Sequence, residues 1–192
     1  MRLFHAIPAL FLLAACAAPH NVPANRLATA NPPPAPVAQE DKDWGINAPD
    51  GYMSESYHHP TPMTVPGATT LLTSELLLRV QQPTPPVLVD VLGGDPHPTI
   101  PGAAWVKGGG LSGDIFTPER EERFADTLET LTGGQMDRYL VFFCQDSSCW
   151  LSWNAARRAV VLGYTNVYWY RGGVTAWRAA NLPTVTAARY QW

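Results

Sequence analysis

The chain has 192 residues, with 13 lysines and arginines against 16 aspartates and glutamates, a formal net charge of -3 and a pI near 5.9. This charge balance offers no basic face for nucleic acid. After the amino-terminal segment, no apolar stretch is long enough to span a membrane. The composition therefore leaves small molecules and other proteins as the expected partners.

The amino-terminal segment, residues 1–15, is typical of a bacterial export signal, because Arg2 is followed by a short apolar run. The tetrapeptide Leu-Ala-Ala-Cys that ends at Cys16 predicts cleavage before this cysteine and a lipid anchor on it. Cleavage near Ala18 by an ordinary secretory route is the alternative. Ala17, in place of an aspartate, favours the outer membrane. We expect a periplasmic, lipid-anchored protein whose only membrane contact is the Cys16 lipid.

Three further segments follow the signal. Residues 16–44 are rich in alanine, proline and asparagine, and they hold too little apolar area to fold, so they predict a disordered tether. Residues 45–66 contain more aromatic side chains and predict an irregular arm. Residues 67–192 have the patterning of one folded domain.

Helix and strand signals alternate along this domain. Thr73 or Ser74 caps a first short helix, and Pro118 and Gly133 bound a longer one. In chain order the expected elements are a helix over 75–80, a strand over 87–91, a helix from 118 to about 132, a strand over 139–143, a helix over 150–162, a strand over 167–170 and a helix over 174–180. This order predicts a single three-layer α/β domain with a mostly parallel central sheet.

Two cysteines flank the short segment 145–148, between a strand and a helix. Cys144 ends the strand and faces the helix amino terminus, where unpaired N–H groups and the helix dipole favour a thiolate. Cys149 is close enough to pair with it, and an oxidising periplasm favours pairing. The pair is either a reversible redox couple or a static disulfide. A metal site is less favoured, since two cysteines without nearby histidine fall short of four ligands.

The domain resembles the rhodanese family through the strand VLVDV (87–91), the tetrapeptide IPGA (100–103), the strand before Cys144 and the segment 155–173. The pattern CW-x-SWNAA-x-RA, from Cys149 onward, is similar to rhodanese-like proteins named for a CxxCW motif and associated with pyrroloquinoline quinone (PQQ)-dependent catabolism. The resemblance implies a nucleophilic Cys144 able to carry a persulfide, a structural Asp90, and a PQQ-dependent dehydrogenase or a c-type cytochrome as partner. No cofactor is required by the residues themselves.

The loop also departs from the rhodanese pattern. It is about two residues longer than usual, it contains neither glycine nor arginine, and Cys149 stands near the place of the arginine that binds a sulfur donor. These departures predict weak thiosulfate sulfurtransferase activity. Leu92 replaces an arginine and Thr99 a histidine near Asp90, which predicts that the polar partners of Asp90 are lost and the pocket rim is remodelled.

The substrate or partner contacts are expected on the loop and on the helix behind it. The candidates are Gln145, Asp146, Ser147, Ser148, Trp150 and Trp153. Trp150 and Trp153 share a helix face and form either an exposed platform or part of the core. Arg157 and Arg158 are expected to be solvated, and His58 and His59 to lie at the surface.

The sequence thus favours a periplasmic rhodanese-like protein whose Cys144 and Cys149 handle electrons or sulfur in support of PQQ-dependent alcohol oxidation. A non-catalytic docking module with a structural disulfide is the alternative, and a thiosulfate sulfurtransferase is a second one.

Overall fold

The structure, a computed structural model, describes residues 39–192. The expected signal, Cys16 and most of the expected tether lie outside these residues. A five-stranded, fully parallel sheet in the order β1-β6-β5-β2-β4 forms the centre of the fold. Its strands are β1 (Thr69–Leu71), β2 (Val87–Asp90), β4 (Ala104–Trp105), β5 (Leu140–Phe143) and β6 (Val167–Tyr170). A separate antiparallel pair is formed by β3 (Pro98–Thr99) and β7 (Val185–Thr186).

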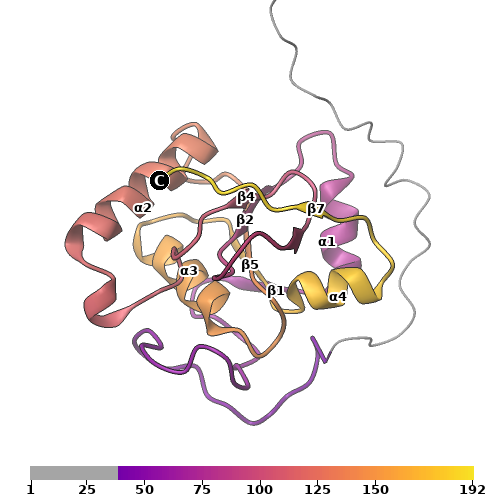
Figure 1. Cartoon of the computed structure of the whole chain (residues 1–192), viewed down its shortest axis with the longest axis horizontal. Helices are drawn as coiled ribbons and strands as arrows, with labels where there is room; N and C mark the ends of the chain where they lie inside the picture. Colours follow the sequence, from indigo (N-terminus) through magenta and orange to yellow (C-terminus); the bar gives the residue numbers. More distant parts are fainter. Residues whose placement is uncertain (1–38) are drawn as a thin grey trace, which may run out of the picture.

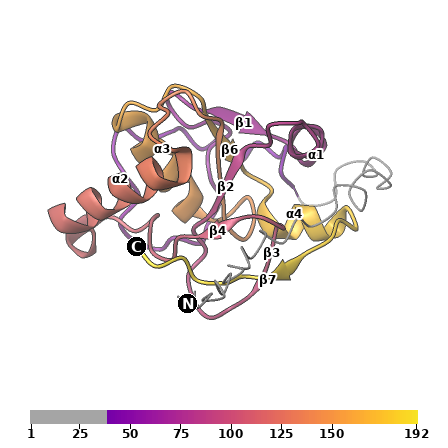
Figure 2. The same ribbon diagram turned by 90° about the horizontal axis from the view of Figure 1, so that it is seen from above.

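Helices cover both faces of the sheet (Figures 1 and 2), as the alternating elements predict. They are α1 (Thr73–Val80), α2 (Pro118–Thr132), α3 (Trp150–Val161) and α4 (Gly173–Ala179), with a short 3-10 turn, η2 (Gly113–Ile115), before α2. The helices α2 and α3 lie together on one face, and α1 and α4 on the other. The predicted three-layer α/β fold with a mostly parallel sheet is therefore confirmed.

The two faces have separate apolar cores because successive strand residues point to opposite sides. On β5, Phe142 packs with the residues of α2 and α3, whereas Val141 and Phe143 pack with those of α1 and α4. All three side chains are fully buried. A continuous apolar strand of this kind is expected only where both faces of a parallel sheet are covered.

The local signals place most helix ends within two residues. Pro118 is the first residue of α2, and Gly133 ends the helix in the left-handed conformation, with φ of 64°. The first helix begins at Thr73 and is preceded by Leu72, so neither expected cap residue takes the capping position. Its amino terminus is held by the carboxylate of Glu40, which accepts the Thr73 N–H and hydroxyl.

Residues 39–44, expected in the tether, contact the domain. Besides its bonds to Thr73, Glu40 accepts a hydrogen bond through its carbonyl from Arg171 at 2.8 Å. The guanidinium of Arg171 lies 4.6 Å from the ring centroid of Trp44. These buried and aromatic contacts replace the solvation expected from the composition, so the packed part of the chain starts no later than residue 39. No helix in the described segment is long and apolar enough to cross a bilayer.

Candidate functional site

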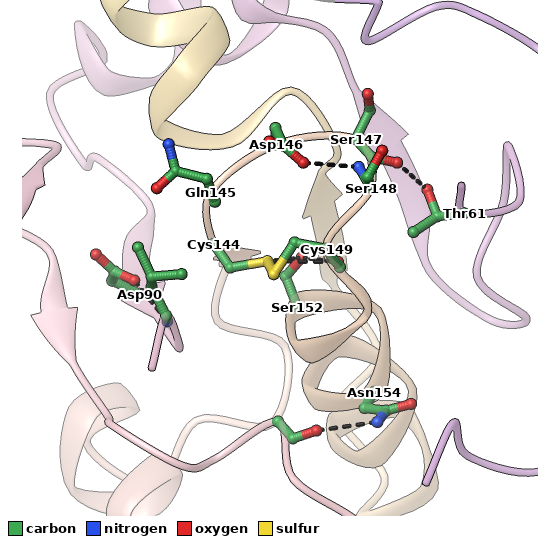
Figure 3. The surroundings of a disulfide bond; sticks show 12 residues. Thr61, Asp90, Cys144, Gln145, Asp146, Ser147, Ser148, Cys149, Ser152 and Asn154 are labelled. Atoms are coloured by element: carbon green, nitrogen blue, oxygen red, sulfur yellow. Dashed lines mark hydrogen bonds between the residues drawn. A yellow bond between two sulfur atoms is a disulfide. The ribbon is translucent and has the colours of Figure 1, made fainter. Parts of the chain in front are cut away.

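A disulfide joins Cys144 to Cys149 in the loop between β5 and α3 (Figure 3). Phe143 ends the strand and Trp150 begins the helix, so one cysteine lies at each boundary. Their Cα atoms are 6.4 Å apart, within the usual range for a bridge. The loop therefore turns back on itself and closes at the start of α3, where the sequence placed the reactive sulfur.

The segment that starts α4 abuts the first half of the loop. Val174 and Thr175 donate their backbone N–H groups to the carbonyls of Cys144 and Gln145, at 3.0 and 2.9 Å. A Cβ on Gly173 would lie 2.5 Å from the Cys144 oxygen, and Gly173 has φ of 58°. This close approach requires glycine. The Gln145 side chain donates to the Thr175 hydroxyl at 2.9 Å, which fixes the loop from the same side.

A serine hydroxyl lies beside one sulfur of the disulfide. Ser152 Oγ, in the first turn of α3, is 3.0 Å from Cys144 Sγ. The indole N–H of Trp169 donates to the same oxygen at 2.9 Å. The Ser152 hydroxyl donates to the Cys149 carbonyl at 3.4 Å, and on reduction of the disulfide it is close enough to donate instead to a Cys144 thiolate, which lowers the pKa of a thiol. The sequence pattern did not single out Ser152.

Three N–H groups at and just before the start of α3 are engaged within the chain. Ser148 N–H donates to the Asp146 carboxylate at 2.8 Å, and Cys149 N–H donates to the Asp146 carbonyl at 3.0 Å. Trp150 N–H donates to the carbonyl of Tyr57 at 2.8 Å. In the closed state, in which the disulfide is formed and residues 45–66 lie over the loop, these three donors are not free to bind the oxyanion of a substrate.

The arm, residues 45–66, covers the second half of the loop. His58 bridges to Cys149 in antiparallel fashion, and the N–H of His59 donates to the Ser148 carbonyl at 2.8 Å. The Thr61 hydroxyl donates to the Ser147 carbonyl at 2.6 Å (Figure 3). Cys144 and Cys149 are consequently only 1% and 4% exposed. The predicted arm thus forms one wall of the site.

Arg171, which follows β6, holds the arm in place. This arginine is fully buried and donates from Nε to the Thr61 hydroxyl at 3.2 Å and from its terminal nitrogen to the Thr61 carbonyl at 3.1 Å. Burial lowers the pKa of its guanidinium. The loop itself contains no arginine, but Arg171 binds Thr61, which in turn binds Ser147 of the loop. Nothing in the sequence spacing between Arg171 and the loop cysteines indicates this contact.

Asp90 is the last residue of the neighbouring strand β2, and its carboxylate is fully buried. It accepts hydrogen bonds from the Thr99 hydroxyl at 2.5 Å, from the Leu92 N–H at 2.9 Å and from His97 Nε2 at 2.8 Å. The prediction that Asp90 loses its polar partners is wrong, because Thr99 and His97 supply donors in place of the usual residues. The pKa of His97 is raised, chiefly by its bond to Asp90.

The other predicted contact residues differ in exposure. Gln145, Asp146 and Ser148 are half-buried, whereas Ser147 is buried. Trp150 and Trp153 are 1% and 0% exposed. The expectation that they bind a partner is wrong for the closed state, since their rings pack in the core and their indole N–H groups donate to His59 and Thr64.

The two arginines of α3 have different surroundings. Arg158 is buried rather than solvated: its guanidinium lies 3.5 Å from the Phe116 ring centroid and donates to the carbonyls of Gly109 and Leu111. The helix face that carries it is turned toward the segment before α2. Arg157 is half-buried and donates to the Pro66 carbonyl at 3.4 Å. Neither arginine contacts the disulfide loop.

Comparison with known proteins places this geometry in a family. Residues 73–180 match the rhodanese-like domain. The chain belongs to that family. No curated protein sequence matches the chain. Among solved structures it is similar to the polysulfide-sulfur transferase homodimer from Wolinella succinogenes, with 18% sequence identity, coverage of 62% of this chain and 80% of that chain, and a TM-score of 0.42. The family assignment confirms the predicted rhodanese-like fold.

In this rhodanese-like domain, the disulfide occupies the loop in which the sequence resemblance expects a nucleophilic cysteine. In residues 39–192, no three histidine, cysteine or carboxylate side chains converge as a metal site would require. The chemistry that the described residues offer at the loop is therefore that of two sulfurs, one hydroxyl and the start of a helix.

Proposed function

We propose that this rhodanese-like protein is an exported thiol–disulfide protein in which Cys144 and Cys149 form a reversible redox couple. The observation that carries this proposal is the disulfide itself, which closes the loop at the start of α3 with the Ser152 hydroxyl 3.0 Å from Cys144 Sγ. A helix amino terminus and a nearby donor both stabilise a thiolate, and a stabilised thiolate favours the reduced form of the pair.

The partner in the proposed exchange is a protein that carries a disulfide. In the reduced protein, the Cys144 thiolate attacks one partner sulfur, and the other partner sulfur leaves and takes up a proton. Cys149, after losing its proton, attacks Cys144 Sγ in the mixed disulfide and releases the partner's second thiol. The protein loses two electrons and two protons, and the partner disulfide gains them. The reverse sequence reduces Cys144 and Cys149.

Part of the surrounding chain must move for this exchange to occur, because both sulfurs are almost fully buried, and the arm is the segment that lies over the second half of the loop. The contacts that hold it over the loop are the backbone bonds from Trp150 to Tyr57 and from His59 to Ser148, and the Thr61 hydroxyl bond to Ser147. Other contacts also hold the arm: Arg171 donates to Thr61, the indoles of Trp150 and Trp153 donate to His59 and Thr64, and Asn154 bonds to the backbone of Met53. Displacing the stretch from Tyr57 to Thr61 frees the Trp150 N–H and breaks the bonds of Arg171 to Thr61, while Arg171 keeps its bond to the Glu40 carbonyl.

A docking module with a locked disulfide is the second candidate, and the low exposure of both cysteines favours it. A glutathione redox titration, followed by thiol alkylation and mass mapping, separates the two. A structural disulfide has a reduction potential below about -300 mV, and the redox proposal requires a clearly higher value. Cys144→Ser and Cys149→Ser are the controls for assignment. If the pair stays oxidised at potentials where structural disulfides survive, the docking module is the better account.

Ser152 provides a sharper test of the same proposal. In the reduced protein, Ser152→Ala should raise the pKa of Cys144 and slow its alkylation at neutral pH by roughly tenfold, the effect of one lost hydrogen bond of about 1.4 kcal/mol. Ser148→Ala, in the loop but without a side-chain contact to Cys144, is the matched control. A pH profile of iodoacetamide reaction measures both. Identical profiles in all three proteins would remove the role assigned to Ser152.

Thiosulfate turnover by this chain should be weak. The loop has no arginine of its own, and its N–H donors at Ser148, Cys149 and Trp150 are bonded to Asp146 and Tyr57. A persulfide on Cys144 would require the same opening of the arm as disulfide exchange. Robust cyanide-dependent turnover that is lost in Cys144→Ala would favour the sulfurtransferase instead.

The cellular setting is part of the proposal and rests on the sequence. The Cys16 lipid anchors the domain to the outer membrane on its periplasmic side, and a PQQ-dependent dehydrogenase or a c-type cytochrome is the partner. Cys16→Ser should release the protein from the membrane fraction, and intact-mass analysis of the native protein measures the lipid. An unmodified chain that begins after Cys16 would exclude the anchor. Loss of PQQ-dependent alcohol oxidation on deletion would support the pathway.

A further inference from the structure

Four cations converge at one small cavity away from the disulfide loop. Lys107 follows β4, Arg120 and Arg123 lie in the first two turns of α2, and Arg189 lies in the carboxyl-terminal segment. All four line a cavity of about 60 Å³, together with Trp192. The chain has a net charge of -3, so this local excess of positive charge runs against its overall composition.

Within residues 39–192, no aspartate or glutamate side chain lies within 4.0 Å of these four cations, and the oxygen that Arg123 contacts belongs to Trp192, the last residue of the sequence. Over the described residues, the only ion pair within 4.0 Å is that of His97 with Asp90. Arg123 donates to the backbone oxygen of Trp192 and lies 5.8 Å from its ring centroid. Lys107 contacts the Trp105 ring at 5.8 Å, which leaves its ammonium charge without a counterion. Lys107, Arg120 and Arg189 leave an excess of positive charge around the cavity, which a bound anion would offset.

The walls that present the cations are fixed. The Trp192 indole N–H donates to the Lys107 carbonyl at 3.1 Å, and the Trp192 ring packs edge-on against Phe124, with 6.1 Å between centroids. Tyr190 N–H donates to the Trp105 carbonyl at 2.9 Å, which positions Arg189 beside β4. The residues of the cluster come from three segments that this packing holds together, so the site is formed before any ligand binds.

We propose that this cluster, Lys107, Arg120, Arg123 and Arg189 around Trp192, is a binding site for a small divalent oxyanion of the phosphate or sulfate type. Arginine binds tetrahedral oxyanions through paired N–H donors, and lysine adds a point charge. Pockets for drug-sized ligands measure about 300–1,000 Å³, so a cavity of about 60 Å³ fits a small ion. Several cations favour a divalent over a monovalent anion.

The cavity adjoins a second hollow of about 240 Å³ that shares Arg123 and Trp192 and includes Asp126. The carboxylate of Asp126 repels an anion from this larger hollow, so the oxyanion is expected among the four cations and not there. A larger ligand would place its charged group among the four cations and its uncharged part in the larger hollow, beside Tyr190.

The test is calorimetric titration of the full folded domain with sodium phosphate, sodium sulfate and sodium chloride at constant ionic strength. We expect saturable binding of the two divalent anions and none of chloride. Arg120→Gln and Arg189→Gln should each weaken binding about tenfold, the effect of one charge-assisted hydrogen bond. Arg178→Gln, an exposed arginine on α4 outside the cluster, should change the affinity less than twofold.

A vesicle experiment distinguishes a free ion from a lipid headgroup. Sedimentation with vesicles that contain phosphatidylglycerol, compared with neutral phosphatidylcholine vesicles, should show no dependence on Arg120 or Arg189. Equal losses in the three variants, the absence of saturable binding to either inorganic anion, or binding to anionic vesicles alone would each overturn the proposal. Far-ultraviolet circular dichroism of every variant confirms that the fold is retained.

Discussion

Two loops lie side by side at the carboxyl edge of the sheet, and they are held in different ways. The strands β2 and β5 pair in parallel, with Asp90 opposite Phe143. The loop after β2 is fixed by the Asp90 carboxylate, whose three donors all lie within nine residues of it. The loop after β5 is fixed by its own disulfide and by an arm that lies 86 to 93 residues away in sequence.

This difference indicates which of the two loops is rigid and which can open. The Asp90 network is local and its carboxylate is fully buried at the end of β2, so opening the network leaves a charge without its donors. The arm contacts close a long loop of chain at the surface edge of the domain. Releasing the arm breaks its bonds to the loop, to Arg171 and to the indoles of Trp150 and Trp153, and it returns conformational freedom to the arm. A site that has to open is therefore expected at the cysteine loop and not beside Asp90.

The largest expected effect comes from breaking the local network. Asp90→Ala leaves the donors of Thr99, His97 and Leu92 without their acceptor, and we expect a loss of about 3–5 kcal/mol in the free energy of unfolding. Asp95→Ala, an exposed carboxylate in the same loop, is the matched control and should cost less than about 0.5 kcal/mol. Urea unfolding followed by tryptophan fluorescence measures both. A small effect of Asp90→Ala would show that the loop is held by its backbone alone.

Reducing the disulfide is expected to have an intermediate effect. For so short a loop the chain-entropy estimate is about 2 kcal/mol. The reduced protein, and the double variant Cys144→Ser with Cys149→Ser, should therefore be less stable by about this amount and still folded. Unfolding by urea in the presence and absence of reductant measures the difference, with the double variant as the control for effects of the reductant itself. Complete unfolding on reduction would make the pair an essential structural link.

The sequence predicts a contact in these two loops when the contacting residues are close together in the sequence. The strands over 87–91 and 139–143 and the closeness of Cys144 to Cys149 follow from neighbouring residues, whereas the structural role of Asp90 is implied by the rhodanese resemblance. The replacement of the usual partners of Asp90 by His97 was missed, because a histidine seven residues away in a loop has no periodic pattern. Only the folded loop brings its ring to the carboxylate.

Contacts between distant segments left no readable pattern at all. Arg171 and Thr61 are 110 residues apart, and neither belongs to a motif of the loop. The same holds for Arg158, whose burial depends on carbonyls in the segment before α2. Trp150 and Trp153 share a helix face in either reading of the sequence. Whether that face is a platform or core depends on the arm and the sheet that cover it.

A smaller effect should come from loosening the arm. Thr61→Val keeps the shape of the side chain but removes the bond to Ser147 and the acceptor for Arg171, so we expect a loss of about 1–2 kcal/mol and disulfide reduction roughly fivefold faster or more. Thr127→Val removes a similar hydroxyl bond, to the Arg123 carbonyl within α2 and outside the arm, and is the matched control. Rates of reduction by dithiothreitol measure the effect. Equal rates in both variants would mean that the arm does not limit access.

The smallest expected effect is a pH dependence of stability that arises from His97, in the loop after β2. Both ring nitrogens of His97 face acceptors, the Asp90 carboxylate and the Asp95 carbonyl, and the bond to Asp90 raises the pKa of His97 above its ordinary value of about 6.5. Because the folded state binds this proton more tightly, the stabilisation is complete below about pH 6.5 and is lost as the pH rises through the higher folded pKa.

The urea midpoint should therefore fall slightly between pH 6 and pH 8.5, and His97→Gln should remove this part of the fall. His58→Gln, an exposed histidine of the arm, should leave it unchanged. The rate of disulfide reduction, corrected for the thiolate fraction of the reductant, should show no difference between His97→Gln and the parent. If His97→Gln did change that rate, the two loops would be coupled across β2 and β5, and the separation between a fixed loop and a movable one would have to be given up.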